Sequence, residues 1–156
     1  MAKKKIKYKN VLAINRRASF NYFIGQTFEA GIQLTGTEIK SVRNHQINIR
    51  DAYITIRGGE TFLNNANISP YKQGNRFNTD PLRQRKLLLH KREISTLHNA
   101  ILKKGKTIIP LRIYIKKGFV KILIAIGTGK KNYDKRRAIK ERDIKRQINR
   151  SLKNFN

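Results

Sequence analysis

Two histidine and carboxylate pairs are the residues of this sequence whose types and spacing could support acid–base chemistry. Glu38 precedes His45, and His90 precedes Glu93, within one or two helical turns of each other. An RNA-cleaving enzyme would need a general base and a general acid held together in this way. Such pairs are far more often ordinary surface residues than catalysts, so we predict no catalytic residue and no enzymatic activity.

The composition also argues against metal and nucleotide chemistry. The chain has no cysteine and only three histidines, which excludes disulfides, thiol catalysis and cysteine-based zinc sites. Most of the acids stand singly, whereas two-metal chemistry needs paired carboxylates. The stretch GTGKK at residues 127–131 lacks the frame and the Ser/Thr of a phosphate-binding loop. We therefore expect no metal site and no cofactor.

The charge of the chain points instead to a polyanionic partner. The 36 Lys and Arg against 9 Asp and Glu give a formal net charge of +27, and such self-repulsion favours nucleic acid or an anionic membrane as partner. No apolar run reaches the roughly 20 residues of a membrane span, and MAKKKIKYK is not followed by a secretory apolar segment. We expect a cytoplasmic protein that binds structured RNA, and not DNA, because no recognition-helix or zinc-finger motif is visible.

The first half of the chain predicts two helices and several strands. The spacing of apolar residues predicts a short helix over 16–24, capped by Asn15, and then a half-buried strand over 26–34. Thr35 and Glu38 have the spacing of a capping box, which predicts a second helix. Residues 52–68 predict a β-hairpin that turns at two glycines. The composition of residues 69–79 predicts a loop. Four large side chains of this loop either reach a partner or fold back on the domain: Tyr71, Lys72, Arg76 and Phe77.

The second half predicts a long helix and a second hairpin. Asp80 and Pro81 form a helix-start signal, and a helix from there to about Lys103 would bury a stripe containing Leu87, Ile94, Leu97 and Ile101. Residues 106–129 predict a hairpin, and Pro110 predicts an edge position or a bulge within it. Five or six mostly antiparallel strands with three helices indicate an α+β fold or a small barrel.

The organisation of the chain is predicted to be one domain between two basic ends. Residues 1–10 form a basic arm, residues 11–129 the folded domain, and residues 130–156 a basic tail. In the tail, Ile144, Ile148, Leu152 and Phe155 form a thin apolar stripe at helical spacing. Like charges predict that the tail is disordered when free and helical once a polyanion screens it.

Three stretches resemble a known family in their order and spacing: FEAGIQLTGTEIKSVR, DPLRQRKLLLHKREI and GKKNYDKRRAIKERD. They resemble SmpB (small protein B), the family of SsrA-binding proteins, from about Asn15 to Asp143. The resemblance implies a mainly β fold: an oligonucleotide-binding (OB) barrel of about six antiparallel strands with three peripheral helices. It also implies binding to the tRNA-like domain of transfer-messenger RNA (tmRNA) near its elbow, as one protein with one RNA, and entry of the pair into stalled ribosomes for trans-translation. The resemblance implies that the protein itself makes and breaks no bond.

The resemblance implies particular RNA contacts. Glu29 of the FEAG strand, Leu88 and His90 in and after the RKLLL run, and Lys121 of the last strand match the family's RNA-contacting positions. A carboxylate is unusual against an anionic ligand, so we expect Glu29 to accept from a base edge or to orient an arginine. From charge alone, we add four further candidates: Arg85, Lys86, Lys130 and Lys131.

The resemblance also assigns the tail to the ribosome. In the family this segment becomes helical in the empty message channel near the decoding centre, which implies ribosome contacts for Tyr133, Asp134, Lys135, Arg136, Ile144 and Ile148. Tyr133 stands where many members carry His. Tyrosine keeps a ring that can stack on a decoding base but lacks the imidazolium charge, so the resemblance supports a stacking role and not a charge-based one. A structural ribosomal protein and a general RNA chaperone are the alternative functions for so basic a chain.

Overall fold

The computed structural model describes residues 10–74 and 78–155. Nine strands lie in this part of the chain: β1 (Val11–Ile14), β2 (Tyr22–Ile32), β3 (Ile47–Asn48), β4 (Tyr53–Arg57), β5 (Glu60–Asn64), β6 (Asn67–Ile68), β7 (Arg85–Leu88), β8 (Lys106–Lys116) and β9 (Phe119–Gly129). Four helices accompany them: α1 (Ala18–Asn21), α2 (Gly36–Arg43), α3 (Lys91–Ile101) and α4 (Asn132–Asn154). The prediction of a mainly β fold with helices is confirmed.

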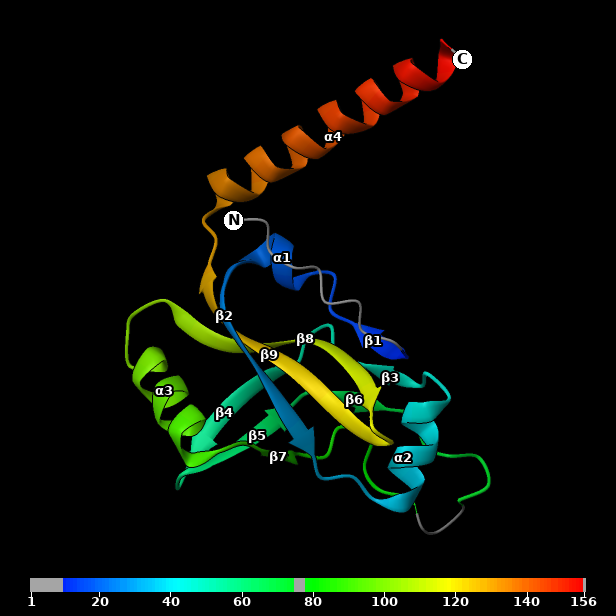
Figure 1. Ribbon diagram of the computed structural model, residues 1–156, viewed down its shortest axis with the longest axis vertical. Coiled ribbons are helices and arrows are strands. Elements are labelled where there is room, and N and C mark those ends of the chain that lie inside the picture. Colours follow the sequence, from blue (N-terminus) through cyan, green and yellow to red (C-terminus); the bar gives the residue numbers. More distant parts are fainter. Residues whose placement is uncertain (1–9, 75–77, 156) are drawn as a thin grey trace.

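The large sheet closes on itself. Its seven strands follow the order β1-β8-β4-β5-β7-β2-β9, and β9 pairs again with β8. Six strands therefore form a continuous ring, with β1 added outside β8, and every pairing within the described residues is antiparallel. Figure 1 shows the long β2, β8 and β9 crossing the middle of the molecule. Alternate side chains of the ring point inward and make the core, including Ile54, Leu63, Leu87, Ile108, Ile113, Ile122 and Ile124.

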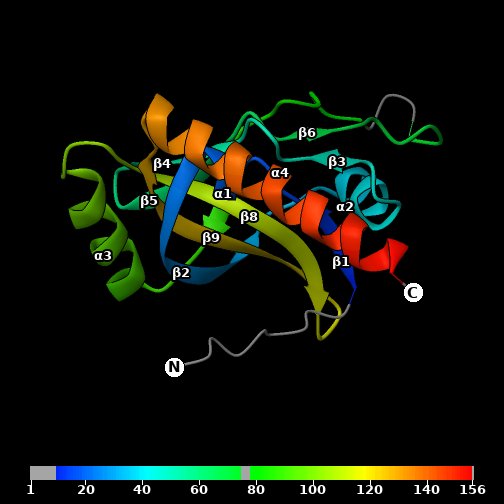
Figure 2. The same cartoon turned by 90° about the horizontal axis from the view of Figure 1, so that it is seen from above.

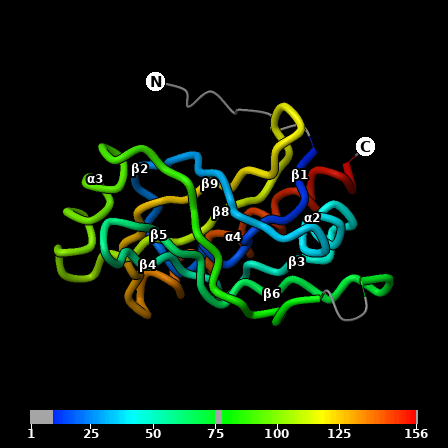
Figure 3. Tube along the Cα trace, turned by 90° about the horizontal axis from the view of Figure 1, so that it is seen from below, coloured from blue at the N-terminus to red at the C-terminus, as the bar shows by residue number. Residues whose placement is uncertain are grey.

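Two helices lie at opposite sides of the ring, as the view from below shows (Figure 3). In α2, the predicted capping box is present: the Glu38 N–H donates to the Thr35 hydroxyl, and the Glu38 side chain accepts from the Thr35 N–H. α3 packs on β8 through Leu97, which is fully buried. These helices cover apolar core that the ring alone would leave open.

The helix predicted over residues 16–24 is much shorter in the structure. α1 has four residues, and Tyr22 and Phe23, which were assigned to the helix, already belong to β2. Asn15 does not cap this helix, since its side-chain amide donates to the Pro110 carbonyl at 3.0 Å. Pairing of Tyr22 with Gly129 in β9 outweighs the local helical spacing.

The helix predicted from Asp80 to Lys103 is wrong in its first half. The Asp80 carboxylate accepts from the Leu82 N–H at 2.9 Å, which makes a turn, and β7 follows. Leu87 therefore belongs to a strand, and α3 begins only at Lys91. The alternation of buried Arg85 and Leu87 with outward-facing neighbours is the signal of a strand that the helix-start signal concealed.

Both predicted hairpins are confirmed. β4 and β5 turn at Gly58 and Gly59, which both have positive φ, and β8 and β9 turn at Lys117 and Gly118. The register of β8 shifts just after Pro110, as a bulge requires. In the loop over 69–79, Tyr71 folds back on the domain, with the Lys40 ammonium 5.3 Å from its ring; Arg76 and Phe77 lie outside the described residues.

The prediction of a disordered tail is wrong, because residues 132–154 form the continuous helix α4. α4 has no buried residue and projects away from the ring (Figure 1), and from above it crosses over the ring (Figure 2). Its charges suit a helix: Asp134 lies in the first turn, Lys153 in the last turn, and Arg137 pairs with Glu141 one turn on. These local terms oppose the repulsion among its cations.

Candidate nucleic-acid interface

Three residues from three strands form a row on the outside of the ring. Gly31 of β2 pairs with Leu88 of β7 on one side and with Lys121 of β9 on the other. Leu88 is 56% exposed, whereas Leu87 beside it is buried. A side chain at Gly31 would come 3.3 Å from the Leu88 Cβ, so glycine allows the leucine to lie close against β2. The sheet thus brings together two residues that are far apart in the sequence.

Glu29 lies two residues before this row and is held by its neighbours. Its carboxylate accepts from the Tyr114 hydroxyl and from the Lys116 ammonium at 3.0 Å. The hydrogen bond from Tyr114 lowers the pKa of Glu29; burial opposes this, and Lys116 adds to the lowering. Of the two roles expected for Glu29, orienting an arginine is not seen, because a tyrosine and a lysine are its partners; acceptance from a base edge stays a prediction. The lowered pKa keeps Glu29 negatively charged at neutral pH.

His90 completes the cluster at the start of α3. It is the N-cap residue, and its N–H donates to the Glu93 carboxylate at 3.0 Å. A hollow of about 330 Å³ is lined by side chains from β2, β7, β9 and this helix start. We call it the Leu88 surface: Glu29, Gly31, Leu88, His90 and Lys121. All four residues that the family resemblance marked for RNA contact meet here.

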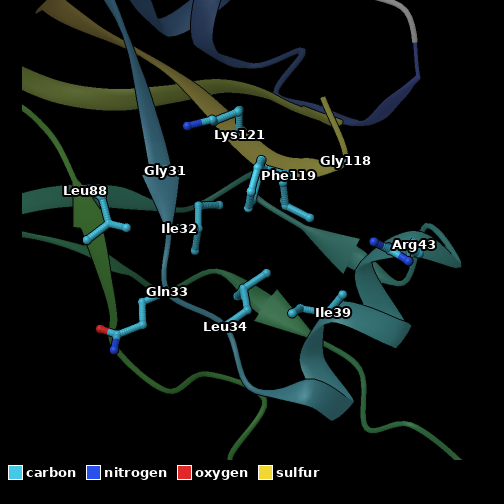
Figure 4. A pocket seen from close by; sticks show the side chains of 11 residues that line it. Gly31, Ile32, Gln33, Leu34, Ile39, Arg43, Leu88, Gly118, Phe119 and Lys121 are labelled. Carbon is cyan, nitrogen blue, oxygen red and sulfur yellow. The ribbon is translucent and has the colours of Figure 1, made fainter. Parts of the chain in front are cut away.

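A second hollow of about 290 Å³ adjoins the Leu88 surface and shares Gly31, Leu88 and Lys121 with it (Figure 4). Its walls include Phe119, which is 70% exposed, and Arg43 from the last turn of α2. An exposed aromatic ring between two cations suits an unstacked base with its phosphates. Sequence analysis missed Phe119 and Arg43; the signal for Phe119 was an aromatic residue directly after the Lys-Gly turn.

The other cations proposed from charge are dispersed. Lys86 faces outward from β7 and pairs with Glu60 at 2.6 Å. Lys130 donates to the Ser19 carbonyl at 3.0 Å and lies 5.0 Å from the centre of the Phe23 ring. Lys131 is exposed as the N-cap residue of α4. Lys130 and Lys131 therefore belong to the base of α4 and not to the Leu88 surface.

The prediction that Arg85 contacts RNA is wrong, because the Arg85 side chain is completely buried. Its guanidinium pairs with the Glu38 carboxylate at 2.8 Å and donates to three backbone carbonyls, those of Ala66, Pro81 and Arg83. Charge alone could not separate a buried arginine from an exposed one. The role of Arg85 is to hold α2 against the chain that leads into β7.

Glu38 lies at the centre of this buried ion cluster. Burial disfavours its charge, but hydrogen bonds from Arg83 and the Thr35 N–H, with the charge of Arg85, outweigh burial and lower its pKa to about 2. His45 does not meet it, because the His45 Nδ1 lies 3.3 Å from the Leu12 carbonyl oxygen. Glu93 caps α3 through the His90 backbone. Both carboxylates of the acid–base pairs thus have structural partners.

The tail residues lie along an exposed helix. Tyr133 is exposed in the first turn of α4, next to Asp134, Lys135 and Arg136. Ile144 and Ile148 are also exposed, in the apolar stripe that continues to Leu152 and Phe155.

Across residues 10–74 and 78–155, the structure has no helix that is long and apolar enough to span a membrane. The same residues contain no group of three His, Asp or Glu side chains that could hold a metal ion.

Comparison with known proteins shows the family of this chain. Residues 12–154 match the family model described as SmpB protein. The SsrA-binding protein of Oenococcus oeni is 74% identical over 152 residues, which are 97% of this chain and 98% of that protein. The SsrA-binding protein of Leuconostoc mesenteroides subsp. mesenteroides is 59% identical over 154 residues, 99% of this chain and all of that protein. A chain of the solved structure described as "tmRNA-SmpB: a journey to the center of the bacterial ribosome" is 42% identical, with a TM-score of 0.67 over 80% of this chain and 87% of that one. The chain therefore belongs to the SmpB protein family.

Proposed function

We propose that this chain binds the tRNA-like domain of tmRNA and carries it to ribosomes stalled on messages without a stop codon, for trans-translation. Relatives that align with this chain over almost their full length are named SsrA-binding proteins. The similar solved chain comes from a tmRNA-SmpB structure on the bacterial ribosome. The closed antiparallel ring with helices at its sides is consistent with an OB-fold barrel, a fold that binds oligonucleotides on its outer face.

The observation that carries this proposal is the Leu88 surface. Leu88 is a large apolar side chain left more than half exposed in a sheet that buries its neighbour Leu87. Lys121 supplies a cation, His90 a ring, and Glu29 an acceptor in the same hollow. An apolar platform with one cation and one acceptor matches RNA recognition, in which bases stack, phosphates pair with cations, and base edges donate hydrogen bonds.

For the tail, we infer that α4 enters the message channel of the small ribosomal subunit. Its exposed cations match a polyanionic channel, and its exposed stripe offers Ile144 and Ile148 for packing. Tyr133 keeps a ring for stacking near the decoding centre, close to Asp134, Lys135 and Arg136. The protein acts as a monomer with one tmRNA, in the cytoplasm where ribosomes translate. The domain boundaries that go with this division are 11–129 for RNA binding and 130–156 for the tail.

Competition between RNAs tests the proposal. The full chain is titrated with labelled tmRNA in the presence of bulk tRNA at a stated moderate salt concentration, because phosphate contacts alone bind any RNA at low ionic strength. We expect a clear preference for tmRNA. Equal binding of both RNAs would favour a general RNA chaperone, and constant stoichiometry with every ribosome would favour a structural ribosomal protein; either result would contradict the proposal.

A further inference from the structure

Tyr114 of β8 is a buried tyrosine whose hydroxyl reaches the Leu88 surface. Its side chain is only 2% exposed. β8 pairs Tyr114 with Lys121 of β9, and β9 pairs Lys121 in turn with Gly31 of β2. Paired residues, and residues two apart on one strand, share a face of a sheet. Tyr114 therefore lies on the face that carries Glu29, and its hydroxyl donates to the Glu29 carboxylate.

Two neighbours fix the direction of the Glu29 carboxylate. The Tyr114 hydroxyl donates to Oε2, and the Lys116 ammonium donates to Oε1 at 3.0 Å and to Oε2 at 3.3 Å. Each carboxylate oxygen has two lone pairs, so Oε1 keeps room for a further donor. A mobile glutamate would lose its rotamer freedom on binding RNA, whereas Glu29 is already held in the free protein. The acceptor is therefore pre-organised for a ligand.

Cations balance the charge of this acid on a surface proposed to meet RNA. A lone carboxylate repels nearby phosphates. The Lys116 ammonium pairs with Glu29, and the charge of Lys121 also lowers the Glu29 pKa. His90 and Glu93 line the same hollow from α3, where the Glu93 carboxylate accepts from the His90 N–H. The hollow thus offers a carboxylate acceptor whose charge is balanced by neighbouring lysines.

Tyr114 also favours the ionised form of Glu29. RNA bound over Glu29 would remove water from the carboxylate, and dehydration favours the protonated form. A protonated carboxyl would donate a hydrogen bond where an acceptor is needed. The hydrogen bond from Tyr114 has the largest effect on the Glu29 pKa and lowers it; burial raises it, and Lys116 lowers it further. Tyr114 therefore opposes protonation of Glu29 when the site is dehydrated.

We propose that Tyr114 is a positioning residue for tmRNA binding, which holds Glu29 as an oriented acceptor while Lys116 supplies the counter-charge. This inference rests on the proposed function, in which Glu29 contacts tmRNA. Because Tyr114 is buried, it acts on the RNA through Glu29. The group that Glu29 receives is a hydrogen-bond donor of the RNA, either the amino group of a base or a ribose hydroxyl.

A double-mutant cycle tests whether Tyr114 acts through Glu29. Tyr114→Phe removes the hydroxyl and keeps the ring, and Glu29→Ala removes the acceptor. Tyr114→Phe alone should weaken the affinity of the full chain for tmRNA about fivefold, because the lost hydrogen bond has a charged partner. In the Glu29→Ala background, the same change should alter affinity by less than about twofold. The matched control is Tyr71→Phe, which removes a hydroxyl bonded to Gln73 outside both hollows and should leave affinity unchanged.

Two outcomes of the cycle would overturn the proposal. Equal weakening in both backgrounds would show that Tyr114 acts on the sheet in general, and no weakening in either would show that its hydroxyl has no role in binding. If Tyr114→Phe does not fold, Lys116→Gln takes its place in the same cycle, because the Lys116 side chain is 53% exposed. The same pattern is expected, the same two outcomes would overturn it, and Lys116→Arg should restore the affinity.

The pH profile of tmRNA affinity is a readout that a merely structural role would not move. The lowered pKa of Glu29 keeps it ionised at pH values where an ordinary glutamate begins to protonate. Loss of the Tyr114 hydroxyl raises this pKa, so on acidification the affinity of Tyr114→Phe should fall at a higher pH than that of the wild type. Titration of His90 and Glu93 is common to both proteins and cancels in the difference.

Identical pH profiles, or wild-type affinity of Glu29→Ala with the preference for tmRNA intact, would overturn the positioning role alone. The proposed function fails separately, if the wild-type chain shows no preference for tmRNA over tRNA.

Discussion

The buried cluster around Glu38 predicts a specific dependence of stability on charge and pH. Glu38 and Arg85 are both buried, and Arg83 pairs with the same carboxylate at 2.7 Å. Glu38→Gln keeps the shape of the side chain but removes its charge. The guanidinium of Arg85 then stays buried without its counter-charge, which typically costs about 3 to 5 kcal/mol.

The magnitude follows from the pKa. Glu38 titrates at about 2 in the folded protein, against an ordinary value of 4.5, and one pKa unit corresponds to about 1.4 kcal/mol. Ionised Glu38 therefore contributes about 3 kcal/mol to folding. Because its pKa is depressed in the folded state, this contribution is fully present above about pH 4.5 and is lost as the pH falls toward 2.

Urea unfolding of the wild type and of Glu38→Gln between about pH 7 and pH 2 measures this contribution. We expect the difference in unfolding free energy between them to be largest near neutral pH and to shrink by about 3 kcal/mol toward pH 2. The matched control is Glu141→Gln, which removes the exposed ion pair with Arg137 on α4 and should change stability by less than about 1 kcal/mol. A difference that is independent of pH, or one no larger than that of the control, would refute the reasoning.

Three further predictions concern the RNA surface and the tail. Gly31→Ala should weaken tmRNA binding, because the new Cβ would crowd Leu88 at 3.3 Å, whereas Gly36→Ala has open space and should not; filter binding compares them. Lys121→Ala should lower affinity and reduce the slope of log affinity against log salt by about one, and an unchanged slope would exclude a phosphate contact there. Truncation after Gly129 should leave tmRNA binding largely intact, abolish tagging of nascent chains on stalled ribosomes and remove the circular-dichroism signal of a 23-residue helix; a large loss of tmRNA affinity would contradict this division.

Features with strong local signals could be predicted from the sequence. The capping box at Thr35 and Glu38, the two hairpins and the bulge at Pro110 each depend on residues that are close in the chain. Where a local signal competed with sheet pairing, the sequence misled: Asp80 and Pro81 begin a turn and not a helix. β7 is decided by its partners β2 and β5, which are distant in the sequence, so the short local alternation of β7 could not by itself outweigh the helix-start signal.

The sequence named several residues that the fold brings together at the candidate site, but it did not indicate the extent of that site. The resemblance marked Leu88 and Lys121, and the register through Gly31 explains why they lie together. Charge alone selected Arg85, which is buried, and overlooked Phe119, which is exposed. The number of cations in a sequence does not show which of them the fold buries. Arg85 is buried because a carboxylate, Glu38, lies beside it in the interior.

The distribution of the nine acids explains how so basic a chain keeps a compact domain. Seven of them have partners within the chain: Glu29, Glu38, Asp51, Glu60, Asp80, Glu93 and Glu141. Six of these seven lie in the body of the protein, where they stabilise helix starts, a turn and the contacts between strands. The cations of α4 have only three acids on their own helix and project away from the body. Repulsion is thereby lowered inside the domain, and the excess positive charge is presented where a polyanionic RNA can neutralise it.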